Sequence, residues 1–173
     1  MTKVEMMRVF VDTEFTDPLN IDLISVALVG ENGQEFYAER NDYRREDCND
    51  FVRAAVLPAL GRIDRAICSR EQLTLRLRTW FEQLPEPATL MFDYSTDWEL
   101  LIDALLGDDY QQPPANIGEK HLLPTELVGD PVFQRARNQS FTREWPPHHA
   151  LADARAFRAG YLAWRVANPE ATG

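Results

Sequence analysis

Hydrophobic and polar positions predict strands over two segments near the start of the chain, Met7–Phe15 and Asp22–Val29, and apolar residues run almost without interruption along the second. A third strand-like segment, Gln34–Glu39, follows after the pair Asn32-Gly33. An Asn-Gly pair between two strands predicts a tight hairpin, because both central residues of that turn need positive φ. The chain is therefore expected to open with three antiparallel strands.

The remainder of the chain alternates between helical and strand-like patterns. Apolar residues at helical spacing predict helices over Asp50–Leu60, Ser69–Leu84, Asp97–Leu106 and about His149–Asn168. Thr89–Tyr94 has the pattern of a buried strand, and a further short strand is expected within Asn116–Leu123. Pro58 weakens the end of the first predicted helix. A three-stranded meander followed by alternating helices and strands indicates an α/β protein with a mixed sheet, in one domain spanning 1–173.

Composition narrows the classes of function. With 18 basic and 28 acidic residues, the net charge is −10, which argues against a broad electrostatic grip on nucleic acid. It does not argue against an enzyme whose bound divalent cations meet the phosphate. No apolar segment is long enough to cross a bilayer, and no membrane association is expected. Cys48 and Cys68 are too few for a disulfide framework or a zinc site, so we expect reduced thiols in a cytoplasmic protein.

Two acidic residues, Asp12 and Glu14, lie near the end of the first predicted strand. Residues i and i+2 of a strand point to the same side, so these two carboxylates project together. Side by side in an apolar strand they repel each other unless a cation lies between them. The pair predicts an oxygen-rich site for Mg²⁺ or Mn²⁺. The alternative is a strand end with two ordinary solvated acids.

A second acidic group, Asp93 and Asp97, lies where a predicted strand gives way to a helix. At such a position an aspartate is a metal ligand or simply a helix cap that complements the helix dipole.

The third group is His148 and Asp153 at the start of the last predicted helix. If that helix packs against the first strand, Asp153 joins Asp12 and Glu14 at one metal, and His148 can act on a bound water. Histidine suits general-base catalysis because its ordinary pKa lies near neutrality. The alternative is a capping histidine and a surface aspartate.

Taken together, the three groups resemble the DEDDh family of 3′–5′ exonucleases. The matching segments are VDTEF (Val11–Phe15), DYSTD (Asp93–Asp97) and HHALADA (His148–Ala154), in the family's order along nearly the whole chain. The segments around Asp22–Glu39 and Phe51–Leu60 are similar, more narrowly, to the small stand-alone exoribonucleases of mycobacteria.

The resemblance implies an RNase H-like fold with a five-stranded mixed sheet flanked by helices. It implies that four acids hold two Mg²⁺ or Mn²⁺ ions: Asp12, Glu14, Asp97 and Asp153. His148 would be the general base, because in the family's spacing His149 is one residue too close to Asp153. The product would be a nucleoside 5′-monophosphate cut from the 3′ end of single-stranded RNA, with single-stranded DNA as the close alternative.

The resemblance also implies substrate contacts at Thr13, Phe15 and Asp93, with Phe15 as a surface on which any base can stack. In the family a polar residue, often asparagine, stands where this chain has Asp93. We therefore assign the metal-binding role to Asp97. Stand-alone relatives are commonly homodimers, and the sequence neither requires nor excludes this.

Two other functions stay open. One is an RNase H-like module without catalytic activity that binds a nucleic-acid end or a protein. The other is a hydrolase restricted to very short oligonucleotides. Arg135, Arg137 and Arg143, upstream of the histidine, could hold substrate phosphates or could form a solvated basic face.

Overall fold

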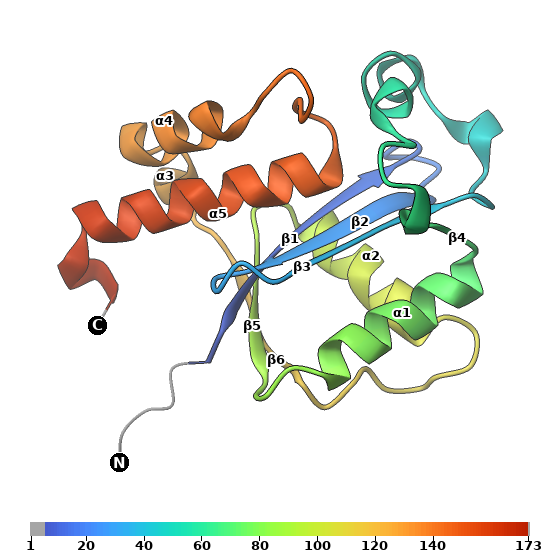
Figure 1. Ribbon diagram of the computed structural model, residues 1–173, viewed down its shortest axis with the longest axis horizontal. Coiled ribbons are helices and arrows are strands. Elements are labelled where there is room, and N and C mark those ends of the chain that lie inside the picture. The colour runs from blue at the N-terminus through green and yellow to red at the C-terminus, as the bar shows by residue number, and fades with distance from the viewer. Residues whose placement is uncertain (1–5, 173) are drawn as a thin grey trace.

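A mixed six-stranded sheet forms the centre of the computed structural model, which describes residues 6–172 (Figure 1). The strands are β1 (Arg8–Phe15), β2 (Leu23–Gly30), β3 (Glu35–Arg40), β4 (Ile67–Cys68), β5 (Ala88–Phe92) and β6 (Ile117–Leu122). Their order across the sheet is β4-β3-β2-β1-β5-β6. The expected mixed α/β architecture is confirmed, although the expected count of five strands is one too low. The additional strand, β4, has only two residues and so leaves no hydrophobic periodicity in the sequence.

Strand β1 lies between β2, with which it is antiparallel, and β5, with which it is parallel. The predicted antiparallel meander of β1, β2 and β3 is confirmed. Its hairpin differs in detail, because Gly33 has a φ of 90° whereas Asn32 has no positive φ. The N–H of Gly33 donates to the carbonyl of Gly30 at 2.9 Å, as in a three-residue loop whose last residue is a left-handed glycine.

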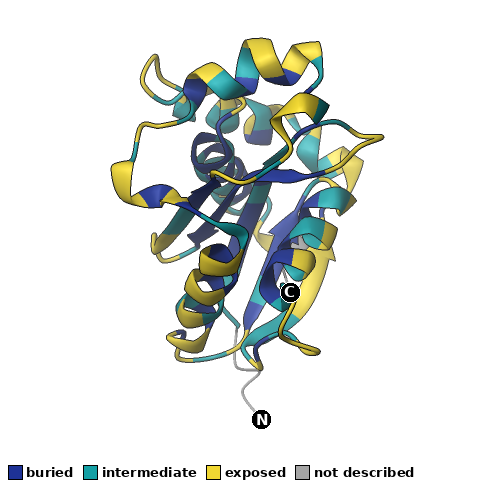
Figure 2. Ribbon diagram, turned by 90° about the vertical axis from the view of Figure 1, so that its right-hand side faces the viewer, coloured by how far each residue is buried: buried dark blue, intermediate teal, exposed yellow. Residues whose placement is uncertain are grey.

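Helices cover both faces of the sheet (Figure 1). They are α1 (Arg70–Glu82), α2 (Ser95–Leu106), α3 (Thr125–Val128), α4 (Pro131–Ser140) and α5 (Ala150–Ala167). Alternation along β1 directs its side chains to the two layers. Val9 and Val11 pack with the apolar faces of α1 and α2, whereas Phe10 packs with Phe133 of α4 and Phe157 of α5. Burial is greatest in the strands between these layers, and the outer faces of the helices are exposed (Figure 2).

The prediction of a regular α-helix over Asp50–Leu60 is wrong, because the segment forms turns of two other helix types. A π-helical turn over Val52–Val56 is followed by a 3₁₀ turn over Leu57–Ala59. Pro58 cannot donate the backbone bond that a regular helix would need there. Phe51, expected on the apolar face of that helix, is 55% exposed.

Helix α4 was not predicted, although its start carries a recognisable signal. The side chain of Asp130 accepts from the N–H groups of Val132 and Phe133, and Pro131 occupies the first turn. Most of its residues are polar and only Phe133 is buried, so the segment resembles a loop in the sequence.

The two cysteines and the helices bear on the expectations drawn from composition. Cys48 and Cys68 are both free and buried. Within residues 6–172, no helix is both long and apolar enough to cross a membrane.

Candidate active site

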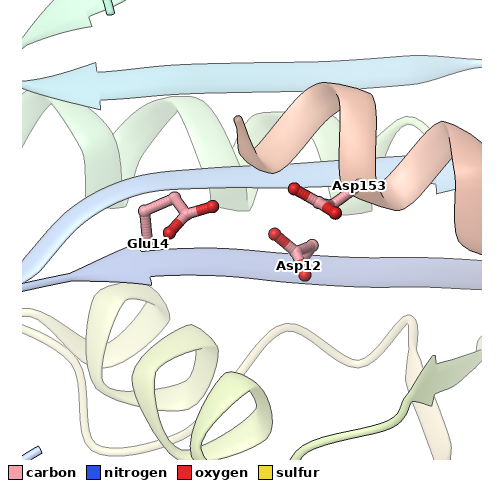
Figure 3. A group of neighbouring side chains, drawn as sticks. All are labelled: Asp12, Glu14 and Asp153. Carbon is pink, nitrogen blue, oxygen red and sulfur yellow. The ribbon is translucent and has the colours of Figure 1, made fainter. Parts of the chain in front are cut away.

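Three carboxylates from opposite ends of the chain meet between β1 and α5 (Figure 3). Asp12 and Glu14 come from β1, and Asp153 comes from the first turns of α5. Each offers an oxygen atom, and these three atoms all lie within 4.8 Å of one another. The structure thus brings together the two acids of the strand and the acid of the last helix, as the sequence predicted.

Local sequence explains why these side chains meet. Because side chains alternate between the two sides of a strand, Phe10, Asp12 and Glu14 all lie on the face of β1 that α5 covers. The start of α5 rests on β2 through small residues, with Ala150 and Ala154 packed against Ala27 and Val29. Small side chains at this contact let the helix axis approach the sheet, which brings Asp153 close to β1.

The environment of the cluster opposes the charged form of its acids. Burial and repulsion by its acidic neighbours raise the pKa of Asp12 well above its ordinary value. The same causes raise the pKa of Glu14 to about 8. Burial also raises the pKa of Asp153. A carboxylate cluster of this kind is stabilised by a bound cation, which replaces the protons that the acids otherwise hold.

Asp153 also organises the entry to α5. Its Oδ2 atom accepts the backbone N–H of His148 at 2.7 Å and that of His149 at 3.2 Å. His148 has a φ of 66°, the left-handed conformation that residues other than glycine seldom adopt and that asparagine, aspartate and histidine tolerate best. The sequence suggested a capping histidine as one alternative, but the structure shows the aspartate as the cap.

The imidazole of His148 is on the exposed side of this turn. Its ring contacts Phe51 edge to face, with the two centroids 4.9 Å apart. When charged, His148 lowers the pKa of Asp153 against the larger effect of burial, so the imidazole is near the cluster. Phe51 was not recognised from the sequence as a neighbour of the histidine, because it served only as one of the apolar residues that predicted a helix over Asp50–Leu60.

Asp97 lies on the first turn of α2, beside the cluster but outside the group of three. It is 3% exposed, and its Oδ1 atom accepts from the hydroxyl of Thr13 at 2.6 Å and from the N–H of Thr13 at 3.1 Å. Burial raises the pKa of Asp97 to about 7, although the two bonds from Thr13 act in the opposite direction. Thr13, expected to contact substrate, is itself buried and faces Asp97.

The other sequence candidates lie around this group. Asp93 is half-buried at the end of β5, and its charge raises the pKa of Asp12 and of Asp97. The ring of Phe15 is stacked on that of Tyr94, with centroids 6.5 Å apart and planes 12° apart. Tyr94 is 51% exposed, so this pair presents an aromatic surface beside the acids.

His149 packs among aromatic side chains. It is 0% exposed and stacks on Tyr37, with Trp145 against its edge. Neither ring nitrogen has a hydrogen-bond partner among the described residues. Burial lowers the pKa of His149 to about 4, so the ring is neutral and serves packing.

Comparison with curated sequences finds a short stretch of clear similarity. A 3′–5′ exoribonuclease of Mycobacterium tuberculosis, in its CDC 1551 and H37Rv strains, is 46% identical over 55 residues. The matched stretch covers 31% of this chain and 33% of the relative, about a third of the relative's length. No family model matches the chain.

Comparison with solved structures shows the same fold along most of the chain. Exonuclease I of E. coli, solved with zinc and single-stranded DNA, superposes with a TM-score of 0.63 at 14% identity. The superposition covers 95% of this chain and 41% of that enzyme. Exonuclease I of Methylocaldum szegediense gives a TM-score of 0.59 at 16% identity, with 95% and 41% covered.

The chain therefore has the RNase H-like fold of the matched part of exonuclease I, which is 41% of that enzyme. The two comparisons also support the resemblance to the 3′–5′ exonuclease superfamily drawn from the sequence.

Proposed function

We propose that the chain is a metal-dependent 3′–5′ exonuclease of the DEDDh superfamily, acting on single-stranded nucleic acid. The observation that carries the proposal is the meeting of Asp12, Glu14 and Asp153, whose oxygens lie within 4.8 Å of one another between β1 and α5. The exonuclease I fold and the exoribonuclease similarity support the same conclusion independently of this geometry.

The donors present fit divalent metal ions. All of them are carboxylate oxygens, the ligands that Mg²⁺ and Mn²⁺ prefer, and no cysteine lies among them. We propose that Asp12, Glu14 and Asp153, with Asp97 beside them, hold two such ions. When bound, two ions supply a clamp on the attacking and leaving oxygens of an in-line phosphoryl displacement.

The protein residues have separate roles in this proposal. His148 accepts the proton of the attacking water, for which the exposed position of its imidazole suits it. Asp153 holds the turn that carries His148, through the bond to the backbone of that residue. Thr13 acts as a positioning residue rather than as the substrate contact expected from the sequence, because its hydroxyl and N–H both orient the carboxylate of Asp97.

We propose that the terminal base lies against the aromatic pair of Phe15 and Tyr94, next to Asp93. Stacking accepts every base, which suits an enzyme without sequence preference. We favour RNA as the substrate because the similar mycobacterial protein is named an exoribonuclease. Single-stranded DNA is the second candidate, because one of the exonuclease I structures was solved with it. The released product is a nucleoside 5′-monophosphate.

We propose that residues 1–173 form one exonuclease domain and that it works in the cytoplasm, where the free thiols of Cys48 and Cys68 stay reduced. Homodimerisation stays a prediction.

A nuclease assay with labelled oligomers tests the function. Single-stranded RNA and DNA carrying a 5′ label are incubated with the protein and Mg²⁺, Mn²⁺ or EDTA. Metal-dependent shortening from the 3′ end, with nucleoside 5′-monophosphates as products, is the expected result. Cleavage of only the shortest oligomers would instead favour a dinucleotide hydrolase, and binding without cleavage would favour the inactive module.

A further inference from the structure

His149 is a buried residue that the proposed mechanism does not use, although it directly follows the general base. Its side chain is 0% exposed, and neither ring nitrogen has a hydrogen-bond partner among the described residues. Buried polar groups normally find partners, so the nitrogens give no reason for a histidine at this position. The contacts that the side chain does make are those of its planar ring.

Two aromatic rings from different parts of the chain hold the imidazole of His149. Tyr37 of β3 stacks on its face, with centroids 4.7 Å apart and planes 28° apart. Trp145 contacts its edge, with centroids 5.1 Å apart and planes 81° apart. Tyr37 is itself fixed to β3, because its hydroxyl donates to Glu39 at 2.7 Å. The three rings therefore join the sheet to the segment that precedes α5.

That segment, residues 141–149, connects α4 to α5 and is braced around Trp145 (Figure 1). The N–H of Thr142 donates to the carbonyl of Trp145, and the N–H of Trp145 donates to the hydroxyl of Thr142, both at 3.0 Å. The guanidinium of Arg155 lies over the indole, 4.8 Å from its centroid. Arg62 donates to the carbonyl of Glu144. Trp145 is thus a fixed support for the ring of His149.

His148 is the exposed residue at the end of this braced segment. Its φ of 66° is a conformation that a residue keeps only when its surroundings determine it. The bonds from Asp153 fix the two amide groups of the turn. Because His149 cannot rotate between its two neighbouring rings, the peptide that links it to His148 also keeps one orientation. The imidazole of His148 is then held against Phe51.

We propose that His149 is the positioning residue of the general base. Its ring, held between Tyr37 and Trp145, fixes the backbone from which the side chain of His148 reaches the attacking water. This inference rests on the proposed function, in which His148 accepts the proton. Placement matters for such a group, because a misplacement of about 1 Å can cost about 10²-fold in rate. Since the nitrogens of His149 make no hydrogen bonds, a phenylalanine ring should serve the same purpose.

Three variants of the ring contacts and one control test this role. His149→Ala removes the ring, His149→Phe keeps a planar ring without the nitrogens, and Trp145→Ala removes the contact at its edge. His121→Ala, which removes an exposed imidazole from β6, is the control. Circular dichroism verifies that each variant is folded at the assay temperature.

Three quantities are measured for each protein. They are kcat and KM for a 5′-labelled single-stranded RNA with Mg²⁺, the affinity for Mn²⁺, and the rate at which trypsin cuts the metal-free protein after Arg143. Arg143 is exposed and lies within residues 141–149, so this cut reports local opening of the segment without any nuclease turnover.

His149→Ala is expected to lower kcat by about 10- to 100-fold and to leave KM and Mn²⁺ affinity within about twofold of the wild type. Trp145→Ala, which leaves the contact with Tyr37 intact, should lower kcat by about 3- to 10-fold. His149→Phe and His121→Ala should stay within about threefold of the wild type. Trypsin should cut His149→Ala after Arg143 faster than it cuts the wild type or His149→Phe.

Several results would overturn the role of His149 alone. A kcat for His149→Phe as low as that of His149→Ala would mean that the nitrogens take part in the reaction. A kcat for His149→Ala equal to that of the wild type would show that the ring is not needed. A loss of Mn²⁺ affinity that matches the loss of kcat would indicate that His149 supports the whole site instead of the general base.

Two further outcomes complete the test. If His149→Ala does not fold, Trp145→Ala decides, and a wild-type kcat in that variant would overturn the inference. A wild type that does not shorten RNA would remove the nuclease function, and the positioning role of His149 with it.

Discussion

The backbone N–H of His148 donates a hydrogen bond of 2.7 Å to Oδ2 of Asp153. This bond gives a physical reason for the spacing of the two residues, because the aspartate on the first turns of α5 reaches back to the residue that precedes the helix. One side chain thus serves as a cap for the turn and as a member of the acid cluster.

Substitution at Asp153 can separate these two roles. Asp153→Asn keeps an oxygen that accepts the two N–H groups but removes the charge. We expect Asp153→Asn to lose cation binding and turnover with an unchanged or slightly higher free energy of unfolding, since it relieves repulsion in the metal-free cluster. Asp153→Ala should lose turnover as well, and should cost about 1 kcal/mol through the lost cap. Urea unfolding in EDTA measures both. Equal stability of the two variants would contradict a capping role.

Substitution at His148 must allow for its φ of 66°. His148→Asn is the suitable variant, because asparagine tolerates the left-handed region, whereas His148→Ala adds a strain of about 1–2 kcal/mol. We expect His148→Asn to keep cation binding and to lower kcat by about 10²–10⁴-fold through loss of the general base. Single-turnover cleavage of labelled RNA measures the rate. A rate for His148→Asn within threefold of the wild type would remove the residue from the mechanism.

Thr13 provides a test of how Asp97 is oriented. Thr13→Val conserves the shape of the side chain but removes the hydroxyl, which bonds Asp97 at 2.6 Å. We expect the free energy of unfolding to fall by about 1–3 kcal/mol, as for a hydrogen bond to a charged group, together with weaker cation binding. Thr13→Ser, which keeps the hydroxyl, is the matched control and should bind cations as the wild type does. Normal cation binding by Thr13→Val would show that this bond does not position Asp97.

The stability of the metal-free protein should depend on pH. Glu14 and Asp97 ionise in the unfolded chain near 4.5 and 3.8, but in the folded protein only near 8 and 7. Between about pH 4 and pH 8 the folded protein holds more protons than the unfolded chain, so these groups make it less stable as pH rises through that range.

Urea unfolding at pH 5 and pH 8 in EDTA measures this effect. Glu14→Gln, which cannot ionise, should show a smaller difference between the two pH values. Mg²⁺ or Mn²⁺ added at pH 8 should restore stability to the wild type. If Glu14→Gln and the wild type had identical pH profiles, Glu14 would not carry the effect.

Much of the site was predictable because short-range rules place its residues. The period of two along β1 determines that Asp12 and Glu14 share a face, and the order of the three acidic segments indicates the family. The bond between Thr13 and Asp97 was not predictable, because it joins residues 84 positions apart and depends on how α2 packs.

Elements of the fold with a regular hydrophobic pattern were predictable, whereas irregular or mostly polar segments were not. The long, strongly patterned strands and helices were predicted to within one or two residues of their ends. The segment containing Phe51 was wrongly predicted as a regular helix, since a π-helical turn and Pro58 interrupt the helical period. Helix α4 was missed because the segment is mostly polar and buries a single residue, Phe133, although the capping signal Asp130-Pro131 is present.

Direct measurement of cation binding by the acid cluster tests the central claim. Free Mn²⁺ is measured by electron paramagnetic resonance during titration of the wild type and of Asp12→Asn, with Arg135→Ala as a control that lies outside the cluster. We expect two Mn²⁺ ions bound per wild-type chain and per Arg135→Ala chain, with binding greatly weakened in Asp12→Asn. Equal Mn²⁺ binding by all three proteins, or none by the wild type, would contradict the central claim.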